Sequence, residues 1–328
     1  MSDQMRLPVT VLTGFLGAGK STLLNRWLHQ PDAQDTLVII NEFGEIGLDH
    51  QLVAHQLEQA MVVELSNGCL CCQLRTDLKK TLKDIHWRFS RNGVRQFKRV
   101  VIETSGMADP APVLHTLMTD TYVAAAYQLD GVVTLVDGVL GMHTLAQHPE
   151  AMKQVQLADR LLVSKADIAD VAELSRLQAY LHQVNPAAQV VLLDPAVLSM
   201  TPDLLFGMRP ETGFPHWLSV LHVPVLHGGE VTSLSLELKP IPRQDFMQWL
   251  ELLRDYQDAG LLRLKGLFFI EGEHAPVAVH RVQHILHEPE ALPQWQGSER
   301  HSRLVLISQT SIGNETRQLL QPLARFIA

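Results

Sequence analysis

The stretch G-F-L-G-A-G-K-S-T, residues 14–22, indicates the architecture of this chain. It follows the apolar run L-P-V-T-V-L-T, residues 7–13, and precedes L-L-N-R-W-L, which has the composition of a helix. Strand, loop and helix in this order are the context that the phosphate-binding pattern G-x-x-x-x-G-K-[ST] requires. The glycines let main-chain N–H groups at a helix N-terminus point at phosphate oxygens. The sequence therefore predicts a nucleotide-binding P-loop here.

Each residue type in this loop has an expected role. We expect Lys20 to contact the terminal phosphates and to act in catalysis, and Ser21 to ligate magnesium. The other nucleotide-binding residues expected in the loop are Gly14, Gly17, Ala18, Gly19 and Thr22. The alternative is a chance match in a glycine-rich turn, and the surrounding strand and helix pattern argues against it.

Further apolar runs rich in Val, Ile and Leu recur between helical patterns. They are residues 36–40, 61–65, 99–103, 131–137, 160–164 and 188–193. Such near-continuous runs are typical of parallel strands that are buried on both faces, with helices as crossovers. The fold class predicted for this part is α/β, a P-loop NTPase with a mostly parallel sheet.

The remainder of the chain predicts a smaller α+β domain. Residues 231–238, 261–270, 277–285 and 303–307 read as strands, residues 243–257 as a helix, and a last helix includes Leu319 and Leu323, with Pro322 as a kink. Pro and Gly are frequent between residues 200 and 229, as is typical of segments that connect domains. We therefore expect a GTPase domain at 1–212, a linker at 213–228 and a C-terminal domain at 229–328.

Composition narrows the function classes. The net charge of -8 argues against nucleic acid as a partner, because neutralising phosphates needs a basic face. No signal-peptide pattern opens the sequence, and no apolar run approaches the roughly 18 to 20 residues that span a bilayer. We expect a cytoplasmic protein that does not enter the membrane; a homo-oligomeric state stays open.

Two polar motifs end later strands. V-V-I-E-T-S-G places Glu103 and Gly106 at the carboxyl end of a strand, where ligands of α/β proteins gather. Glu103 is expected to hold magnesium through water or to polarise the attacking water, and the Gly106 N–H to sense the terminal phosphate. Taken alone, an acidic residue in this place is often only a cap. Its order behind the P-loop favours the catalytic interpretation.

The stretch L-L-V-S-K-A-D ends another strand with Ser164, Lys165 and Asp167. An ionised Asp offers only acceptors, so it matches the N1–H and 2-amino group of guanine, whereas adenine has no such donor pair. The guanine-reading consensus is N/T-K-x-D, and Ser164 departs from it. We expect these three residues to bind the base of GTP, with ATP and a plain surface loop as alternatives.

All the cysteines of the chain, Cys69, Cys71 and Cys72, lie in N-G-C-L-C-C. Apolar residues at helical spacing follow from Leu74, so a helix is expected to begin just after Cys72. The helix dipole and nearby Arg75 would favour thiolates, which select zinc or copper(I). Three sulfurs leave a tetrahedral zinc site incomplete. The fourth ligand must come from elsewhere or stay exchangeable, and a carboxylate from N-E-F-G-E-I-G-L-D, residues 41–49, is a candidate for a movable one. Plain burial of the cysteines and a redox role are the alternatives.

Together these motifs resemble the CobW-type family of metallochaperone GTPases, relatives of the nickel-insertion GTPases of the CobW/HypB/UreG superfamily. The resemblance also covers the C-terminal part, which contains R-L-K-G-L-F-F-I-E-G. It implies a GTPase that binds zinc, or a related divalent metal, at Cys69, Cys71 and Cys72 and delivers it to a client apo-metalloprotein. Some relatives carry an acidic residue where this chain has Ile40, so Glu45 is the expected carboxylate ligand.

Turnover should be slow, because no arginine finger or water-positioning Gln appears in motif context. Two functions stay open besides the metallochaperone. One is a zinc buffer or sensor gated by nucleotide, and the other is a P-loop enzyme of cofactor biosynthesis.

Overall fold

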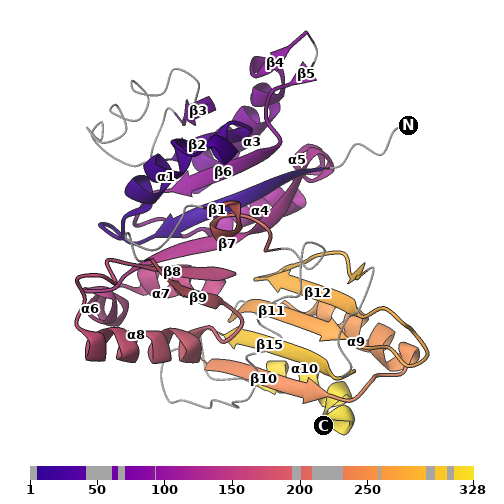
Figure 1. Cartoon of the computed structure of the whole chain (residues 1–328). Helices are drawn as coiled ribbons and strands as arrows, with labels where there is room; N and C mark the ends of the chain where they lie inside the picture. Colours follow the sequence, from indigo (N-terminus) through magenta and orange to yellow (C-terminus); the bar gives the residue numbers. More distant parts are fainter. Residues whose placement is uncertain are drawn as a thin grey trace. The chain divides into compact units, whose positions relative to one another are not determined.

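The computed structural model describes residues 6–41, 61–65, 71–92, 94–193, 201–208, 232–257, 260–292, 300–308 and 314–328. The chain forms two compact units (Figure 1). The first holds Met1–Leu177 and Val190–Met208, and the second holds Gln178–Gln189 and Arg209–Ala328. The linker expected at 213–228 lies outside the described residues, and the domain limits 1–212 and 229–328 stay a prediction.

The first unit is built on a sheet with the strand order β3-β2-β6-β1-β7-β8-β9. Its strands are β1 (Leu7–Gly14), β2 (Thr36–Asn41), β3 (Met61–Glu64), β6 (Arg99–Thr104), β7 (Tyr127–Asp137), β8 (Arg160–Ser164) and β9 (Gln189–Leu192). The five neighbouring pairs from β3 to β8 are all parallel. Every apolar run expected to be a strand belongs to this sheet, and the α/β prediction is confirmed.

Helices cover both faces of this sheet. The helices of the first unit are α1 (Lys20–Leu28), α3 (Cys71–Arg88), α4 (Ala111–Thr119), α5 (Thr121–Ala126), α6 (Gly141–Gln147), α7 (Pro149–Leu157) and the first half of α8 (Val171–Val184), which continues into the second unit from Gln178. On one face, α1 packs Leu24 and Trp27 into a core with Leu135 of β7. Thr134 points to the opposite face, because strand side chains alternate, and its hydroxyl donates to the Gln154 carbonyl of α7 at 2.9 Å. Burial on both faces explains the near-continuous apolar runs.

Smaller elements complete the described part of this unit. They are the hairpin strands β4 (Ser90–Arg91) and β5 (Val94–Arg95) and the 3₁₀ turns η1 (Pro31–Ala33) and η2 (Pro202–Leu204). None of the helices in the described residues is both long and apolar enough to cross a bilayer.

The second unit contains an antiparallel sheet with the order β10-β15-β11-β12-β13, in which β14 also pairs with β12. The strands are β10 (Thr232–Leu238), β11 (Leu261–Phe268), β12 (Val277–Val282), β13 (Ile285–Leu286), β14 (Glu290–Ala291) and β15 (Ser302–Ser308). Helix α9 (Arg243–Asp255) packs Phe246 and Trp249 onto Phe268, with ring centroids 5.2 and 4.6 Å apart. The α+β prediction for this part is confirmed.

The strand expected over 261–270 and the helix expected over 243–257 each end two residues early, at Phe268 and Asp255, and two further elements differ more. The strand expected over 277–285 ends at Val282, where Gln283 takes the left-handed φ of 51° and β13 folds back onto β12. The last helix is divided into α10 (Asn314–Leu320) and the 3₁₀ segment η5 (Gln321–Phe326). Pro322 lies at this change, where its missing N–H cannot continue the α-helical pattern.

Candidate functional site

The loop between β1 and α1 takes a shape that only glycine allows at Gly14. Its φ is 144°, and a Cβ there would lie 2.5 Å from the carbonyl oxygen of Leu135 on the neighbouring strand β7. Gly19 has a φ of 94° and caps the N-terminus of α1. The loop therefore turns tightly out of the sheet and presents main-chain N–H groups at the start of a helix, as a phosphate site requires.

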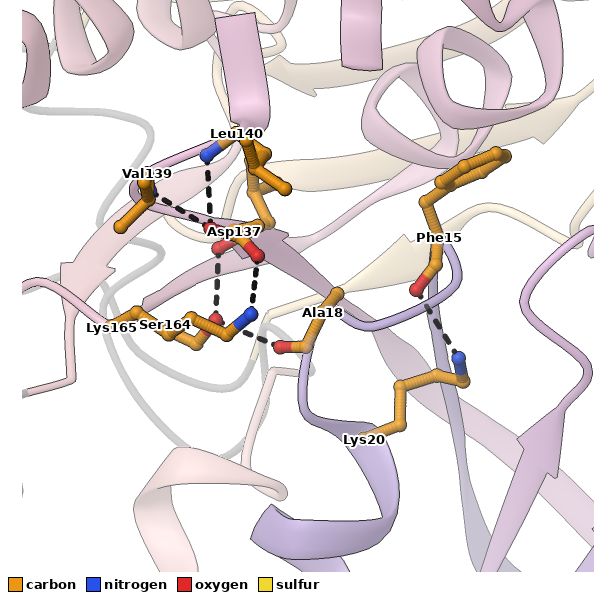
Figure 2. Close-up of polar contacts among 9 residues, drawn as sticks. Phe15, Ala18, Lys20, Asp137, Val139, Leu140, Ser164 and Lys165 are labelled. Atoms are coloured by element: carbon orange, nitrogen blue, oxygen red, sulfur yellow. Dashed lines mark hydrogen bonds and ion pairs between the residues drawn. The ribbon is translucent and has the colours of Figure 1, made fainter. Parts of the chain in front are cut away.

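Lys20 folds back over this loop. Its Nζ donates to the carbonyl of Phe15 at 3.4 Å (Figure 2) and to that of Gly14 at 2.9 Å, and the residue is 9% exposed. The ammonium group is thus held beside the loop amides. Phosphate groups bound to these amides would therefore contact the positive charge of Lys20 without any movement of its side chain.

Ser21 and Glu103 meet from two different elements. The Ser21 hydroxyl donates to Oε1 of Glu103 at 3.2 Å, and Glu103 is 3% exposed. Glu103 stands near the carboxyl end of β6, in register with Leu12 of β1. Neighbouring ligands of an octahedral magnesium ion lie about 3.0 Å apart, given metal–oxygen distances of about 2.1 Å. The hydroxyl and the carboxylate therefore fit magnesium in type and spacing.

Ser164 connects the S-K-A-D motif to the P-loop. Its hydroxyl donates to the Ala18 carbonyl at 2.8 Å, although the two residues are far apart in sequence (Figure 2). Ser164, which stands where the consensus has Asn or Thr, therefore still supplies a hydrogen-bond donor. The bond ties the two loops together directly.

Lys165 is anchored by Asp137, the last residue of β7. Its Nζ lies 2.6 Å from Oδ2 of Asp137, and Oδ1 accepts the N–H groups of Val139 and Leu140 at 2.8 and 3.0 Å (Figure 2). Burial works to raise the pKa of Asp137, but the hydrogen bonds from Lys165 and from these amides outweigh it, and the pKa is lowered. Asp137 therefore stays ionised and binds the ammonium group of Lys165, whose backbone is left-handed with a φ of 56°.

A cavity of about 620 Å³ opens between the two loops. Gly19 and Thr22 line it from the P-loop side, and Ser164, Lys165 and Asp167 from the other. This volume is in the range of small-molecule sites. The cavity thus brings Gly19 and Thr22 of the P-loop together with the three expected base-reading residues, whereas Lys20, Ser21 and Glu103 do not line it. The individual roles of all these residues stay predictions.

The cysteine segment begins at the same edge of the sheet. Glu64 at the end of β3 and Glu103 of β6 are both in register with Ile40 of β2. Helix α3 begins at Cys71, so Cys71 and Cys72 belong to its backbone, and the expected start just after Cys72 is wrong by two residues. The described part of the structure does not include the side chains of Cys71 and Cys72, nor any part of Cys69 or Glu45. Among the residues that are described, no group of three or more His, Cys, Asp or Glu side chains is arranged to hold a metal.

Asp137 is the site residue that the sequence analysis missed. The signal was present, because Asp137 ends an expected strand just as Glu103 does. Its importance arises from pairing of β7 with β8, which places it in register with Ser164.

Comparison with known proteins identifies the family. Residues 8–192 match the model "CobW/HypB/UreG, nucleotide-binding domain", and residues 231–324 match the "Cobalamin synthesis protein cobW C-terminal domain". The zinc chaperone YjiA of Escherichia coli is 34% identical over 305 residues, which cover 92% of this chain and 93% of YjiA. The zinc chaperone CobW of Pseudomonas aeruginosa is 28% identical, with 98% of this chain and 93% of CobW covered.

A solved structure agrees with these matches. The crystal structure of Zn(II)-bound YjiA GTPase from E. coli aligns with a TM-score of 0.71 at 27% identity, and the alignment covers 99% of this chain and 100% of that one. The chain therefore belongs to the CobW/HypB/UreG family and is a P-loop GTPase.

Proposed function

We propose that this protein is a GTP-hydrolysing metallochaperone that binds zinc at Cys69, Cys71 and Cys72 and transfers it to a client apo-metalloprotein in the cytosol. The observation that carries the proposal is the shared edge of the sheet. Leu65 follows β3 and donates its N–H to the Ile40 carbonyl at 3.0 Å, two strands from Glu103. Two strand spacings amount to about 10 Å. The six residue-to-residue steps from Leu65 to Cys71 span at most about 20 Å, so the cysteines begin within that reach of the end of β3.

Nucleotide chemistry at this edge has a role for each expected residue. The P-loop amides and Lys20 would hold the phosphates, and Ser21 with Glu103 would hold magnesium, which would supply charge stabilisation to the transferring phosphoryl group. Lys165 and Asp167 read guanine. The Gly106 N–H senses the terminal phosphate. Turnover is slow, because the motifs contain no arginine finger.

Zinc is the cargo in this scheme. Cys71 and Cys72 open a helix, and thiolates are favoured at a helix N-terminus. Three cysteine sulfurs and Glu45 complete a tetrahedral set. Glu45 follows β2 in the sequence, and Ile40 near the end of β2 is in register with Glu103, so the state of the nucleotide would decide whether this fourth ligand is in place. The naming of two relatives as zinc chaperones supports zinc as the metal.

Zinc affinity tests this mechanism. Chelator competition is measured with GDP, GTP and a non-hydrolysable GTP analogue, on the wild type and on variants with each cysteine changed to serine. We expect affinity to depend on the nucleotide and to fall by tenfold or more, at least about 1.4 kcal/mol, in each variant. Lys80→Ser, an exposed change on the same helix α3, is the matched control.

A zinc-binding but nucleotide-independent protein would contradict the proposal. A transfer assay separates donor from buffer: the zinc-loaded protein is mixed with a fluorescent chelator and then with an apo zinc enzyme. GTP is expected to accelerate transfer to the enzyme. A nucleotide-gated buffer would release zinc to the chelator and give the enzyme no advantage.

A further inference from the structure

Residues 105–108, directly after β6, form a tight turn that walls the phosphate site. The Ala108 N–H donates to the Ser105 carbonyl at 3.0 Å and closes the turn. A Cβ on Gly106 would lie 2.6 Å from Cδ2 of Leu16 and 2.8 Å from its main-chain nitrogen. The backbone of Gly106 therefore lies directly against the P-loop.

The other side of this turn is held by Gln154 of α7. Its Nε2 donates to the Gly106 carbonyl at 3.1 Å and to the Ala108 carbonyl at 3.0 Å. The residue is 0% exposed. The two hydrogens of one carboxamide thus serve two carbonyls of one turn. The opposite amide orientation would set Oε1 against both carbonyl oxygens, so the acceptors determine the orientation.

Helix α7 is itself fixed on both sides of this contact. The main-chain carbonyl of Gln154 accepts the Thr134 hydroxyl of β7 at 2.9 Å. Lys153 pairs with Oδ2 of Asp109 at 2.6 Å, and Oδ1 of Asp109 accepts the Ala111 N–H at 2.9 Å. The sheet therefore carries α7, and α7 holds both the turn and the segment that follows it.

Glycine has the widest backbone freedom, so the direction of the Gly106 N–H has to be set by contacts outside its own side chain. The hydrogen bond to the Gly106 carbonyl fixes the peptide after Gly106, the Ala108 N–H fixes the Ser105 carbonyl of the peptide before it, and Leu16 leaves the backbone between them little room to turn. We propose that Gln154 is a positioning residue of the GTPase site, which holds the 105–108 turn so that the Gly106 N–H faces the terminal phosphate. This rests on the proposed role of Gly106 as the sensor of that phosphate.

The test compares nucleotides that differ only in the terminal phosphate. Gln154→Met keeps the length of the side chain and removes both donors. Binding of GDP and of a non-hydrolysable GTP analogue is measured by calorimetry with magnesium, together with kcat and KM for GTP and the melting temperature without nucleotide. Gln147→Met, an exposed glutamine of α6, is the matched control.

We expect Gln154→Met to weaken the analogue about tenfold relative to GDP, the effect of about one charge-assisted hydrogen bond, and to lower kcat by at least as much. Affinity for GDP and the properties of Gln147→Met are expected to stay within about twofold of the wild type. A purely structural role would lower the melting temperature and leave the ratio of the two affinities unchanged, which would overturn the inference.

Lys153→Met decides the matter where Gln154→Met does not fold. It removes only the anchor at Asp109, and the same preferential loss of the analogue is expected at about threefold. An unchanged ratio in that variant overturns the inference. A wild type that neither binds nor hydrolyses GTP would instead defeat the proposed function itself, and the role of Gln154 with it.

Discussion

The hydroxyl of Ser164 donates a hydrogen bond of 2.8 Å to the carbonyl of Ala18. This bond joins the loop expected to read the base to the loop expected to hold the phosphates. Removing it in Ser164→Ala should weaken GDP and GTP alike by about fivefold, since one neutral hydrogen bond contributes about 1 kcal/mol. Calorimetric titration measures the effect. Ser164→Thr keeps the hydroxyl and should bind like the wild type, and equal losses in both variants would contradict the role of the bond.

Asp167 is expected to determine base specificity. Asp167→Asn replaces one acceptor by an amide donor, which suits the 2-carbonyl of xanthine and opposes the 2-amino group of guanine. We expect a loss of GTP affinity of about tenfold or more and a gain of xanthosine triphosphate affinity. Competition with a fluorescent nucleotide measures both. Asp170→Asn, in an exposed cap where Asp170 accepts the Ala172 and Glu173 N–H groups, is the control. Unchanged base preference in Asp167→Asn would exclude this residue from the base site.

Glu103 is expected to govern the magnesium requirement. Glu103→Gln keeps the shape and the acceptor for the Ser21 hydroxyl but removes the charge. The magnesium concentration for half-maximal GTP hydrolysis should rise about tenfold or more, because a neutral amide oxygen is a weaker ligand than a carboxylate. Steady-state hydrolysis over a magnesium titration checks this, with Glu150→Gln as the control. An unshifted magnesium curve would exclude Glu103 from the metal site.

Asp137 gives a stability effect with a defined pH dependence. Its pKa is lowered on folding, so its contribution is complete above the ordinary value of 3.8 and is lost as pH falls through the lower folded value. Asp137→Asn should therefore lower the free energy of unfolding at pH 7 by about 1 to 3 kcal/mol. The difference from the wild type should shrink below about pH 4.

Urea denaturation at several pH values measures this difference. A penalty for Asp137→Asn that stays constant down to pH 3 would show that the carboxylate charge is not its origin.

Gly106 leaves no room for a side chain against the P-loop. In Gly106→Ala the new Cβ would meet the Leu16 main-chain nitrogen at 2.8 Å, and a backbone atom cannot rotate away as a side-chain end can. We expect the turn to shift and GTP hydrolysis to fall about tenfold. Single-turnover kinetics measure the chemical step. Met107→Ala, at the neighbouring exposed position of the same turn, should hydrolyse GTP like the wild type.

The sheet of the first unit was predictable because strands that are buried on both faces are apolar at nearly every position, so each appears in the sequence as a short apolar run. The start of β7 at Tyr127 rather than at residue 131 was missed, since Y-Q-L-D mixes polar and apolar residues. Tyr127 is held there by pairing with Leu7 and by its hydroxyl, which donates to the Leu82 carbonyl at 2.7 Å. The turn at Gln283 was missed because no Gly, Asn or Pro marks it.

For the site, motif spacing predicted which residues reach the carboxyl edge of the sheet. The contacts that these side chains make with one another at that edge were not predictable. The ion pair of Lys165 with Asp137 depends on β7 and β8 being neighbours, and the bond from Ser21 to Glu103 depends on the order of β1 and β6. Which strands lie side by side in the sheet depends on the packing of the whole unit, and the sequence of a single segment does not contain that information.

The ammonium group of Lys20 rests on two carbonyls of its own loop. Its water shell is therefore largely removed when the protein folds, before any nucleotide arrives. A phosphate that enters has only to replace peptide dipoles as the partner of this cation, and the dehydration cost does not count against binding. The positive potential of the loop is therefore already in place before the nucleotide binds. Added salt should lower the association rate of nucleotide and protein more than it lowers the affinity of the finished complex.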